Sequence, residues 1–295
     1  SSPKLVMGLL VGWLMGALCM YLLMVFWLGQ RLHDDHAESH AADVPTIPQE
    51  KYDGWQTLHV FYGKQDGLKI PTQQKWFSQV HQDEIVVDLI QRVNHNSKDH
   101  SQNYYFIDLA ANDAKEFSNT LALEQHGWEG LCIEPNPTYW YDLSHRKCTV
   151  VGALVGGDTV ERVEVKFRGV YGGMLGKMDV KLANRKREPP APTQERYTAP
   201  LGDVLQQFHV PNTVHYLSLD VEGMEFDILQ HFPFDKIVIQ ILTVERPTPP
   251  LRRLLEQNGY LFLKDLAWWG ETLWAHKSTG LSPAHPKIVQ IQTEE

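Results

Sequence analysis

The sequence has few cysteines and lacks the short motifs that bind structural zinc. Only three cysteines occur in 295 residues, which is too few for a disulfide framework. Cys19 lies within an apolar run, so only Cys132 and Cys148 are placed to pair. A bridge between them would need an oxidising compartment, and unpaired thiols are the expected state. Because neither C-x-x-C nor H-E-x-x-H occurs, the sequence predicts no metal site.

Positive charge is also scarce. Lys and Arg together number 27 against 36 Asp and Glu, which gives a formal net charge of -9. Nucleic acids bind to clustered Lys and Arg, so this balance argues against a nucleic-acid partner. The content of 43% hydrophobic and 21% charged residues is typical of a folded globular protein, and the length suffices for one large domain.

A long apolar run lies near the N-terminus. Residues 5–28 contain no charged side chain. At ~1.5 Å per residue, a helix of this length spans roughly 36 Å, which exceeds the hydrocarbon core of about 30 Å. We therefore predict one transmembrane helix within residues 1–31 and a single-pass membrane protein. The sequence leaves open whether the membrane is an endomembrane or an organellar one.

Three glycines recur at every fourth position of this run: Gly8, Gly12 and Gly16. They share one helix face, and small residues on one face let another helix approach closely. The pattern predicts packing against another transmembrane helix. The partner is either a second copy of this chain or a subunit of a membrane complex.

The remainder of the chain divides into three parts. Residues 32–73 are polar and acidic, with scattered proline and glycine, and are predicted to be a stalk. Residues 74–280 carry the pattern of a folded domain, which opens with helical spacing over residues 75–93. Residues 281–295 are predicted to be a C-terminal tail.

Short apolar runs alternate with helical segments in the predicted domain. They are residues 104–109, 130–134, 149–155, 215–220 and 237–244. Buried runs separated by helices are typical of a parallel sheet built from βαβ units. Residues 259–266 and 271–277 are predicted to be two strands joined tightly, which adds an antiparallel edge. The predicted fold class is α/β and Rossmann-like, with a mostly parallel sheet and a C-terminal antiparallel strand.

Four of the predicted strands end in a carboxylate: Asp108, Glu134, Asp220 and Glu245. Ligands of such sheets bind beyond the C-terminal ends of the strands. One acid there commonly caps the next helix, whereas four favour a cationic, hydroxyl-rich ligand such as a sulfonium nucleoside. Glu134 is placed to accept hydrogen bonds from ribose hydroxyls. A helix is expected to begin near Asn112 or Asp113. A nicotinamide dehydrogenase is disfavoured because no G-x-G-x-x-G follows the first strand.

Four segments resemble the FkbM-type methyltransferase family: FIDLAANDAKEFSNT, GWEGLCIEPNPTYW, YLSLDVEGMEFDIL and LFLKDLAWWGETLWAHK. The resemblance rests mainly on IEPNP followed by DVEGxE. It implies a class I methyltransferase fold, S-adenosylmethionine as cofactor, and methylation of an oxygen on a small-molecule or glycan acceptor. The cofactor-binding residues that it implies are Asp108, Ala110, Asn112, Glu134, Asn136 and Asp220.

A hydroxyl acceptor also needs a base at the moment of attack. The candidate catalytic residues are Glu222 and Glu245, with Asp220 next. The family has glycine where this chain has Ala110 and Ala114, and glycine allows a close approach of the backbone. Two hypotheses stay open. The four carboxylates favour a membrane-anchored O-methyltransferase, whereas the two alanines and the glycine helix face favour a catalytically silent accessory subunit of a membrane complex.

Overall fold

A computed structural model describes residues 58–63, 68, 75–94, 103–168, 171–175 and 192–295. The predicted transmembrane helix at 1–31, its glycine face and residues 32–57 of the stalk lie outside the described residues, so they stay predictions. Among the residues that are described, no helix combines the length and apolarity needed to cross a membrane.

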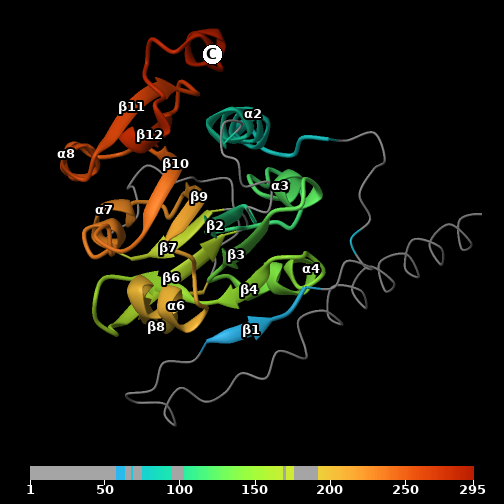
Figure 1. Ribbon diagram of the computed structural model, residues 1–295. Helices are drawn as coiled ribbons and strands as arrows, with labels where there is room; N and C mark the ends of the chain where they lie inside the picture. The colour runs from blue at the N-terminus through green and yellow to red at the C-terminus, as the bar shows by residue number, and fades with distance from the viewer. Residues whose placement is uncertain (1–57, 64–67, 69–74, 95–102, 169–170, 176–191) are drawn as a thin grey trace, which may run out of the picture. The chain divides into compact units, whose positions relative to one another are not determined.

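The domain is built on an eight-stranded sheet in the order β1-β4-β3-β2-β9-β10-β12-β11 (Figure 1). Its strands are β1 His59–Phe61, β2 Tyr105–Leu109, β3 Glu129–Ile133, β4 Thr149–Gly152, β9 Thr213–Leu219, β10 Val238–Glu245, β11 Tyr260–Asp265 and β12 Glu271–His276. The five neighbours from β4 to β10 run parallel. Strand β12 lies antiparallel to both β10 and β11. The predicted α/β class and the antiparallel C-terminal strand are confirmed.

The helices of the described chain are short. They are α2 Gln82–Asn94, α3 Leu121–Gln125, α4 Trp140–Leu143, α6 Leu201–Gln207, α7 Glu225–Leu229, α8 Pro249–Gln257 and α9 Pro286–Gln290, with the 3₁₀ turns η2 Pro137–Tyr139 and η3 Lys277–Thr279. Helix α2 begins later than the predicted residue 75. The carboxylate of Asp83 accepts the backbone N–H groups of Phe77 and Ser78 and so holds these residues in a preceding turn.

The central strands are buried on both faces. In β2, Phe106 belongs to one hydrophobic cluster, while Ile107 and Leu109 belong to the other, as expected for side chains that alternate across a strand. Apolar residues of α2, α3, α4 and α9 complete the Phe106 cluster, and those of α6, α7 and α8 complete the Ile107 cluster. Helices therefore cover both faces of the sheet, which is the arrangement that a parallel sheet requires.

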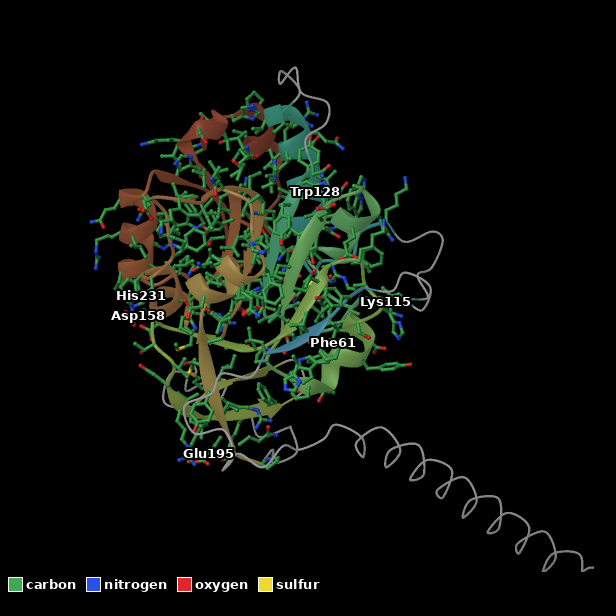
Figure 2. All side chains as sticks on the ribbon, turned by 60° about the horizontal axis from the view of Figure 1, so that its bottom comes forward. Phe61, Lys115, Trp128, Asp158, Glu195 and His231 are labelled. Carbon is green, nitrogen blue, oxygen red and sulfur yellow. A yellow bond between two sulfur atoms is a disulfide. The ribbon has the colours of Figure 1, made fainter. Side chains whose placement is uncertain are left out.

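A second sheet of four strands was not predicted. Its order is β5-β8-β6-β7, with β5 Leu154–Gly156, β6 Arg162–Arg168, β7 Tyr171–Met174 and β8 Gln194–Pro200. Its side chains join the Ile107 cluster through Val165 and Met174. At its rim, the exposed Asp158 carboxylate lies 3.6 Å from His231 Nδ1 (Figure 2); exposed pairs of this kind contribute little to stability.

The folded domain extends past both boundaries drawn from composition. Strand β1 lies within the predicted stalk, yet it pairs antiparallel with β4, with His59 opposite Gly152. Trp140 packs its ring on His59 and Phe61. In the predicted tail, Ile288 is buried, and residues around Glu294 bond to the β11–β12 connection. These segments are too short to show a hydrophobic period, so composition alone classed them as stalk and tail.

Candidate active site

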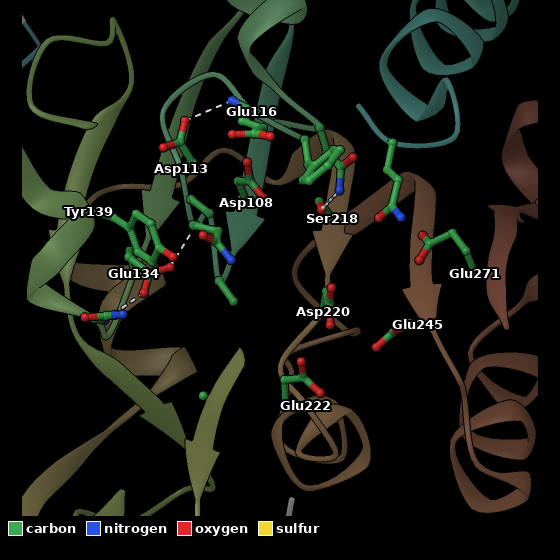
Figure 3. A pocket seen from close by; sticks show the side chains of 18 of the residues that line it. Asp108, Asp113, Glu116, Glu134, Tyr139, Ser218, Asp220, Glu222, Glu245 and Glu271 are labelled. Carbon is green, nitrogen blue, oxygen red and sulfur yellow. Dashed lines mark hydrogen bonds between the residues drawn. The ribbon is translucent and has the colours of Figure 1, made fainter. Parts of the chain in front are cut away.

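A pocket of about 650 Å³ opens at the C-terminal ends of the parallel strands. Every residue predicted for the site lines this pocket: Asp108, Ala110, Asn112, Glu134, Asn136, Asp220, Glu222 and Glu245. Figure 3 shows Glu134 on one side of it and Asp220, Glu222 and Glu245 on the other. We call these sides the Glu134 wall (Asp108, Ala110, Asn112, Glu134, Asn136) and the acidic wall (Asp220, Glu222, Glu245, Glu271).

The loop after β2 differs from the prediction. No helix begins at Asn112 or Asp113, and the next helix, α3, begins only at Leu121. The backbone N–H groups of Ala110 and Ala111 both donate to the carbonyl oxygen of Ile133. These bonds fold the loop across the end of β3, so the chain cannot continue directly into a helix.

Three non-glycine residues of this loop have left-handed backbones, namely Ala110 with φ 62°, Asn112 with φ 53° and Phe117 with φ 59°. Asparagine tolerates this conformation, whereas alanine is disfavoured there. The glycine expected at position 110 thus has a conformational reason in addition to close approach. Ala114 is different, because it is fully buried in the Phe106 cluster and does not line the pocket.

Glu134 is held by the backbone on both oxygens. Its Oε2 accepts the N–H of Asn112 at 2.8 Å, and its Oε1 accepts the N–H of Asn136 at 2.7 Å. Burial raises the pKa of Glu134 to about 7, while these two hydrogen bonds act in the opposite direction. Each oxygen retains a second lone pair. The carboxylate is therefore fixed in place and can still accept hydrogen bonds from a ligand.

Asp108 lies beside Glu134 and is only 2% exposed. It accepts a hydrogen bond from the Thr120 hydroxyl at 2.6 Å and forms another with Ser218 of β9. Burial raises the pKa of Asp108, and the Arg146 guanidinium and these two hydrogen bonds counteract the rise. Like Glu134, this carboxyl is positioned by fixed donors.

The carboxyls of the acidic wall are arranged differently. Asp220 and Glu245 hydrogen-bond to each other through their side chains. Burial and the charge of Asp220 raise the pKa of Glu245 to about 9, and the same causes raise the pKa of Glu271 to about 8. Arg246 Nη2 donates to Glu245 Oε1 at 2.5 Å. At neutral pH, the Asp220–Glu245 pair therefore holds a proton.

The turn that carries Glu222 is shaped by another acid of the DVEGME segment. Glu225 Oε1 accepts the backbone N–H groups of Val221 and Gly223. Glu222 itself has a left-handed backbone with φ 53°, a conformation that is common at functional sites and costs of order 1 kcal/mol. Glu225 is thus a structural residue of the motif, whereas Glu222 lines the pocket.

Several pocket residues were missed by the sequence reasoning. Among them are Gln82, Asn119, Ser218, Trp268, Trp269 and Glu271. Glu271 begins β12 and lies opposite Glu245, the last residue of β10. Because the two strands are antiparallel, the start of one lies beside the end of the other. The predicted antiparallel hairpin therefore contained the signal that would have located Glu271.

The expectation of unpaired cysteines was wrong: Cys132 and Cys148 form a disulfide. Cys132 lies on β3 opposite Val150 of β4, and Cys148 precedes Val150 by two residues. The Cα atoms of the two cysteines are 6.1 Å apart. Strand pairing brings the two together, which spacing in sequence did not reveal. The bridge closes the segment that carries Glu134 and Asn136.

The fold is Rossmann-like, and its carboxylate-lined pocket lies at the C-terminal ends of the parallel strands. The Methyltransferase FkbM domain family matches residues 108–262, more than half of the chain, and the chain belongs to this family. No curated protein matches the sequence significantly.

Among solved structures, the chain is similar to the precorrin-6y C5,15-methyltransferase of Geobacter metallireducens GS-15. The two share 13% sequence identity over 68% of this chain and 82% of that one, with a TM-score of 0.34.

Proposed function

We propose that this chain is an S-adenosylmethionine-dependent methyltransferase that methylates a hydroxyl group. One observation carries the proposal beyond family membership. Glu134 stands at the end of β3 with both carboxylate oxygens oriented by backbone N–H groups, and it faces the pocket. That is the position at which an acid of a doubly wound sheet accepts the hydroxyls of a bound ribose.

The charge of the pocket fits this cofactor. Among the described residues that line the pocket, eight carry a carboxyl group and one, Arg246, carries a guanidinium. S-adenosylmethionine carries a sulfonium and an ammonium cation, and opposite charges favour the ionised form of nearby carboxyls. The volume of about 650 Å³ lies within the range of about 300–1,000 Å³ that is usual for pockets that bind small ligands.

The cofactor, when bound, supplies an electrophilic methyl group on its sulfonium. The residues of the chain then have two tasks. The Glu134 wall would hold the nucleoside of the cofactor, and such positioning of the reactants supplies much of the rate. The acidic wall provides a base for the hydroxyl proton. The candidates for this base are Asp220 and Glu245, which are hydrogen-bonded to each other, and Glu222.

The membrane attachment is part of the proposal. The uncharged run at residues 5–28 supports a single-pass anchor, and the face of Gly8, Gly12 and Gly16 supports a contact with a second helix, from a copy or from another subunit. Buried disulfides are characteristic of oxidising compartments. The Cys132–Cys148 bridge therefore supports a position of the domain on the lumenal side of an endomembrane or organellar membrane.

Calorimetry with the full chain in detergent micelles tests the proposed activity. We expect S-adenosylmethionine and its demethylated product to bind, and we expect transfer of a labelled methyl group to a hydroxyl acceptor. If neither compound gives heat or a thermal shift at millimolar concentration, the methyltransferase proposal fails. The alternative of a silent accessory subunit then becomes the better reading of the two alanines.

A further inference from the structure

A chain of buried polar side chains runs from the pocket into the domain behind Asp108. The Thr120 hydroxyl donates to Asp108 Oδ2 at 2.6 Å, and Arg146 Nη2 donates to the Thr120 oxygen at 2.8 Å. Neither Thr120 nor Arg146 lines the pocket, and both are at most 1% exposed. The pocket carboxyl is thus oriented by a hydroxyl that is itself oriented by a buried cation.

Arg146 uses all three nitrogens of its guanidinium. Nε and Nη2 donate to Glu124 Oε1 at 3.0 and 2.7 Å, and Nη1 donates to Ser118 Oγ at 3.0 Å. The planar guanidinium has fixed donor directions, so several bonds to one arginine fix their acceptors relative to one another. Ser118 and Thr120 belong to the loop after β2, and Glu124 belongs to α3.

Glu124 connects this series of hydrogen-bonded side chains to the end of the segment that carries Glu134. Its Oε2 accepts the backbone N–H of Lys147 at 2.9 Å, and its Oε1 accepts that of Cys148 at 3.2 Å. The disulfide partner of Cys148 is Cys132, two residues before Glu134. Arg146 therefore joins the two segments that form the Glu134 wall from behind.

We infer that Arg146 is a positioning residue of the candidate active site: acting through Thr120, it holds the Asp108 carboxyl in the orientation that faces the pocket. The inference rests on the proposed function, in which this carboxyl faces a cationic cofactor. A guanidinium withdrawn completely from water has a large desolvation cost. Its bonds to Thr120 and Glu124 converge on the elements that carry pocket residues, which is what a positioning role requires.

The electrostatics of Asp108 agree with this role. Burial raises its pKa, and the charge of Arg146 and the Thr120 hydrogen bond lower it. The other titratable groups that act on it or feel its charge are Glu124, Glu134 and Tyr216. A hydrogen bond to the carboxylate favours the charged form. Loss of the Thr120 donor should therefore raise the pKa of Asp108 and favour its neutral form.

Thr120→Val tests the inference, with Thr120→Ser as the matched control. Valine has the shape of threonine without its hydroxyl, whereas serine keeps the hydroxyl. Arg146 itself is unsuited, because its loss leaves Glu124 buried without its cation, which is strongly destabilising. Two quantities are measured on the full chain: the titration of the Asp108 carboxyl by ¹³C NMR, assigned with Asp108→Asn, and the affinity for S-adenosylmethionine between pH 5 and 9.

We expect Thr120→Val to move the Asp108 titration to higher pH and to weaken cofactor binding about five- to tenfold near neutral pH, which is less than the loss of a direct hydrogen bond to a charged group because Thr120 acts through Asp108. Thr120→Ser should stay within about twofold of the wild type, since it preserves the bond. A purely structural Thr120 would lower the melting temperature and leave both the titration and the shape of the pH profile unchanged, which overturns the inference.

The NMR measurement separates this inference from the proposed function. If the wild type binds no S-adenosylmethionine, the proposed function fails. If the Asp108 titration then still moves in Thr120→Val and not in Thr120→Ser, the inference that Arg146 and Thr120 position this carboxyl stands. An unmoved titration overturns their role whether or not the cofactor binds.

Discussion

Carboxyl side chains line both sides of the pocket, but their hydrogen-bond partners differ between the two sides. On the Glu134 wall, backbone N–H groups and hydroxyls donate to Glu134 and Asp108. On the acidic wall, Asp220 and Glu245 are bonded to each other and share a proton. Carboxyls with fixed donors are oriented before a ligand arrives, whereas carboxyls that face one another change their charge when a cation or a proton arrives.

The difference indicates a division of labour within one sheet edge. The Glu134 wall is suited to recognise hydroxyls, because its acceptors do not need to reorganise. The acidic wall is suited to respond to positive charge and to accept a proton. A sulfonium compound presents both a ribose diol and a positive charge, so it would use the two walls together.

The largest effect that separates the walls is expected in cofactor affinity. Glu134→Ala should weaken S-adenosylmethionine binding about ten- to a hundredfold, since hydrogen bonds to a charged group contribute roughly 1.5–3 kcal/mol. Glu245→Ala should change affinity less and lower turnover more, because Glu245 belongs to the acidic wall. Calorimetry and a methyl-transfer assay on the wild type and both variants measure this. Equal losses of affinity in the two variants would show that the walls do not differ in this way.

The second effect is in the pH dependence of stability. Burial and Asp220 raise the pKa of Glu245 to about 9, above the value of about 4.3 for an unfolded chain. Between these values the folded protein binds more protons than the unfolded one, so the free energy of unfolding falls as the pH rises. Glutamine does not titrate, so Glu245→Gln removes this pH dependence. At pH 9 the variant should be more stable than the wild type by at least about 1 kcal/mol, or roughly 2–4 °C in Tm.

At pH 5 the same substitution should have little effect on Tm, because the wild-type carboxyl is then protonated and resembles the amide. Melting curves at pH 5, 7 and 9 provide the test. Glu256→Gln, on an exposed part of α8, is the control, and its Tm should follow the wild type at all three values. A constant Tm difference between Glu245→Gln and wild type across this range contradicts the proton-sharing description of the acidic wall.

The smallest effect concerns the backbone that supports the Glu134 wall. Ala110→Gly should raise the free energy of unfolding by about 1 kcal/mol, because Ala110 occupies a left-handed conformation with φ 62° that glycine adopts without strain. Ala114→Gly is the matched control at the second position where the family has glycine. Ala114 is fully buried and its φ is not positive, so glycine there should destabilise by about 1 kcal/mol.

Chemical denaturation measures both alanine variants. The two substitutions should move the midpoint in opposite directions. If Ala110→Gly destabilises as Ala114→Gly does, the loop is not strained at Ala110, and the absence of glycine there needs another explanation. Cofactor affinity measured in parallel shows whether Ala110 also limits binding.

The residues predicted for the site line one pocket for a physical reason. Each predicted residue stands at or just beyond the C-terminal end of a parallel strand, and all such ends lie at one edge of the sheet. Locating the strands therefore located the pocket. Glu271 and Trp269 were missed because they lie within the β11–β12 hairpin, where the strand direction must be known before the edge that a residue occupies can be assigned.

Other predictions needed information that the sequence pattern does not contain. The loop after β2 was predicted as a helix start, but its N–H groups bond to Ile133 and Glu134 in the neighbouring strand. Strand β1 was assigned to the stalk, because three residues with intermediate burial show no period. The membrane helix and its glycine face stay predictions.

The sequence by itself determined the central strands of the parallel sheet, its antiparallel C-terminal strand and the edge at which acids gather, because these follow from local periodicity and from which residues end each strand. Only the tertiary structure decided the disulfide, the buried Arg146 and the proton shared by Asp220 and Glu245. Each of these depends on burial and on distances between residues far apart in the chain. Electrostatic interactions and covalent pairing respond to such distances, which no pattern along the sequence records.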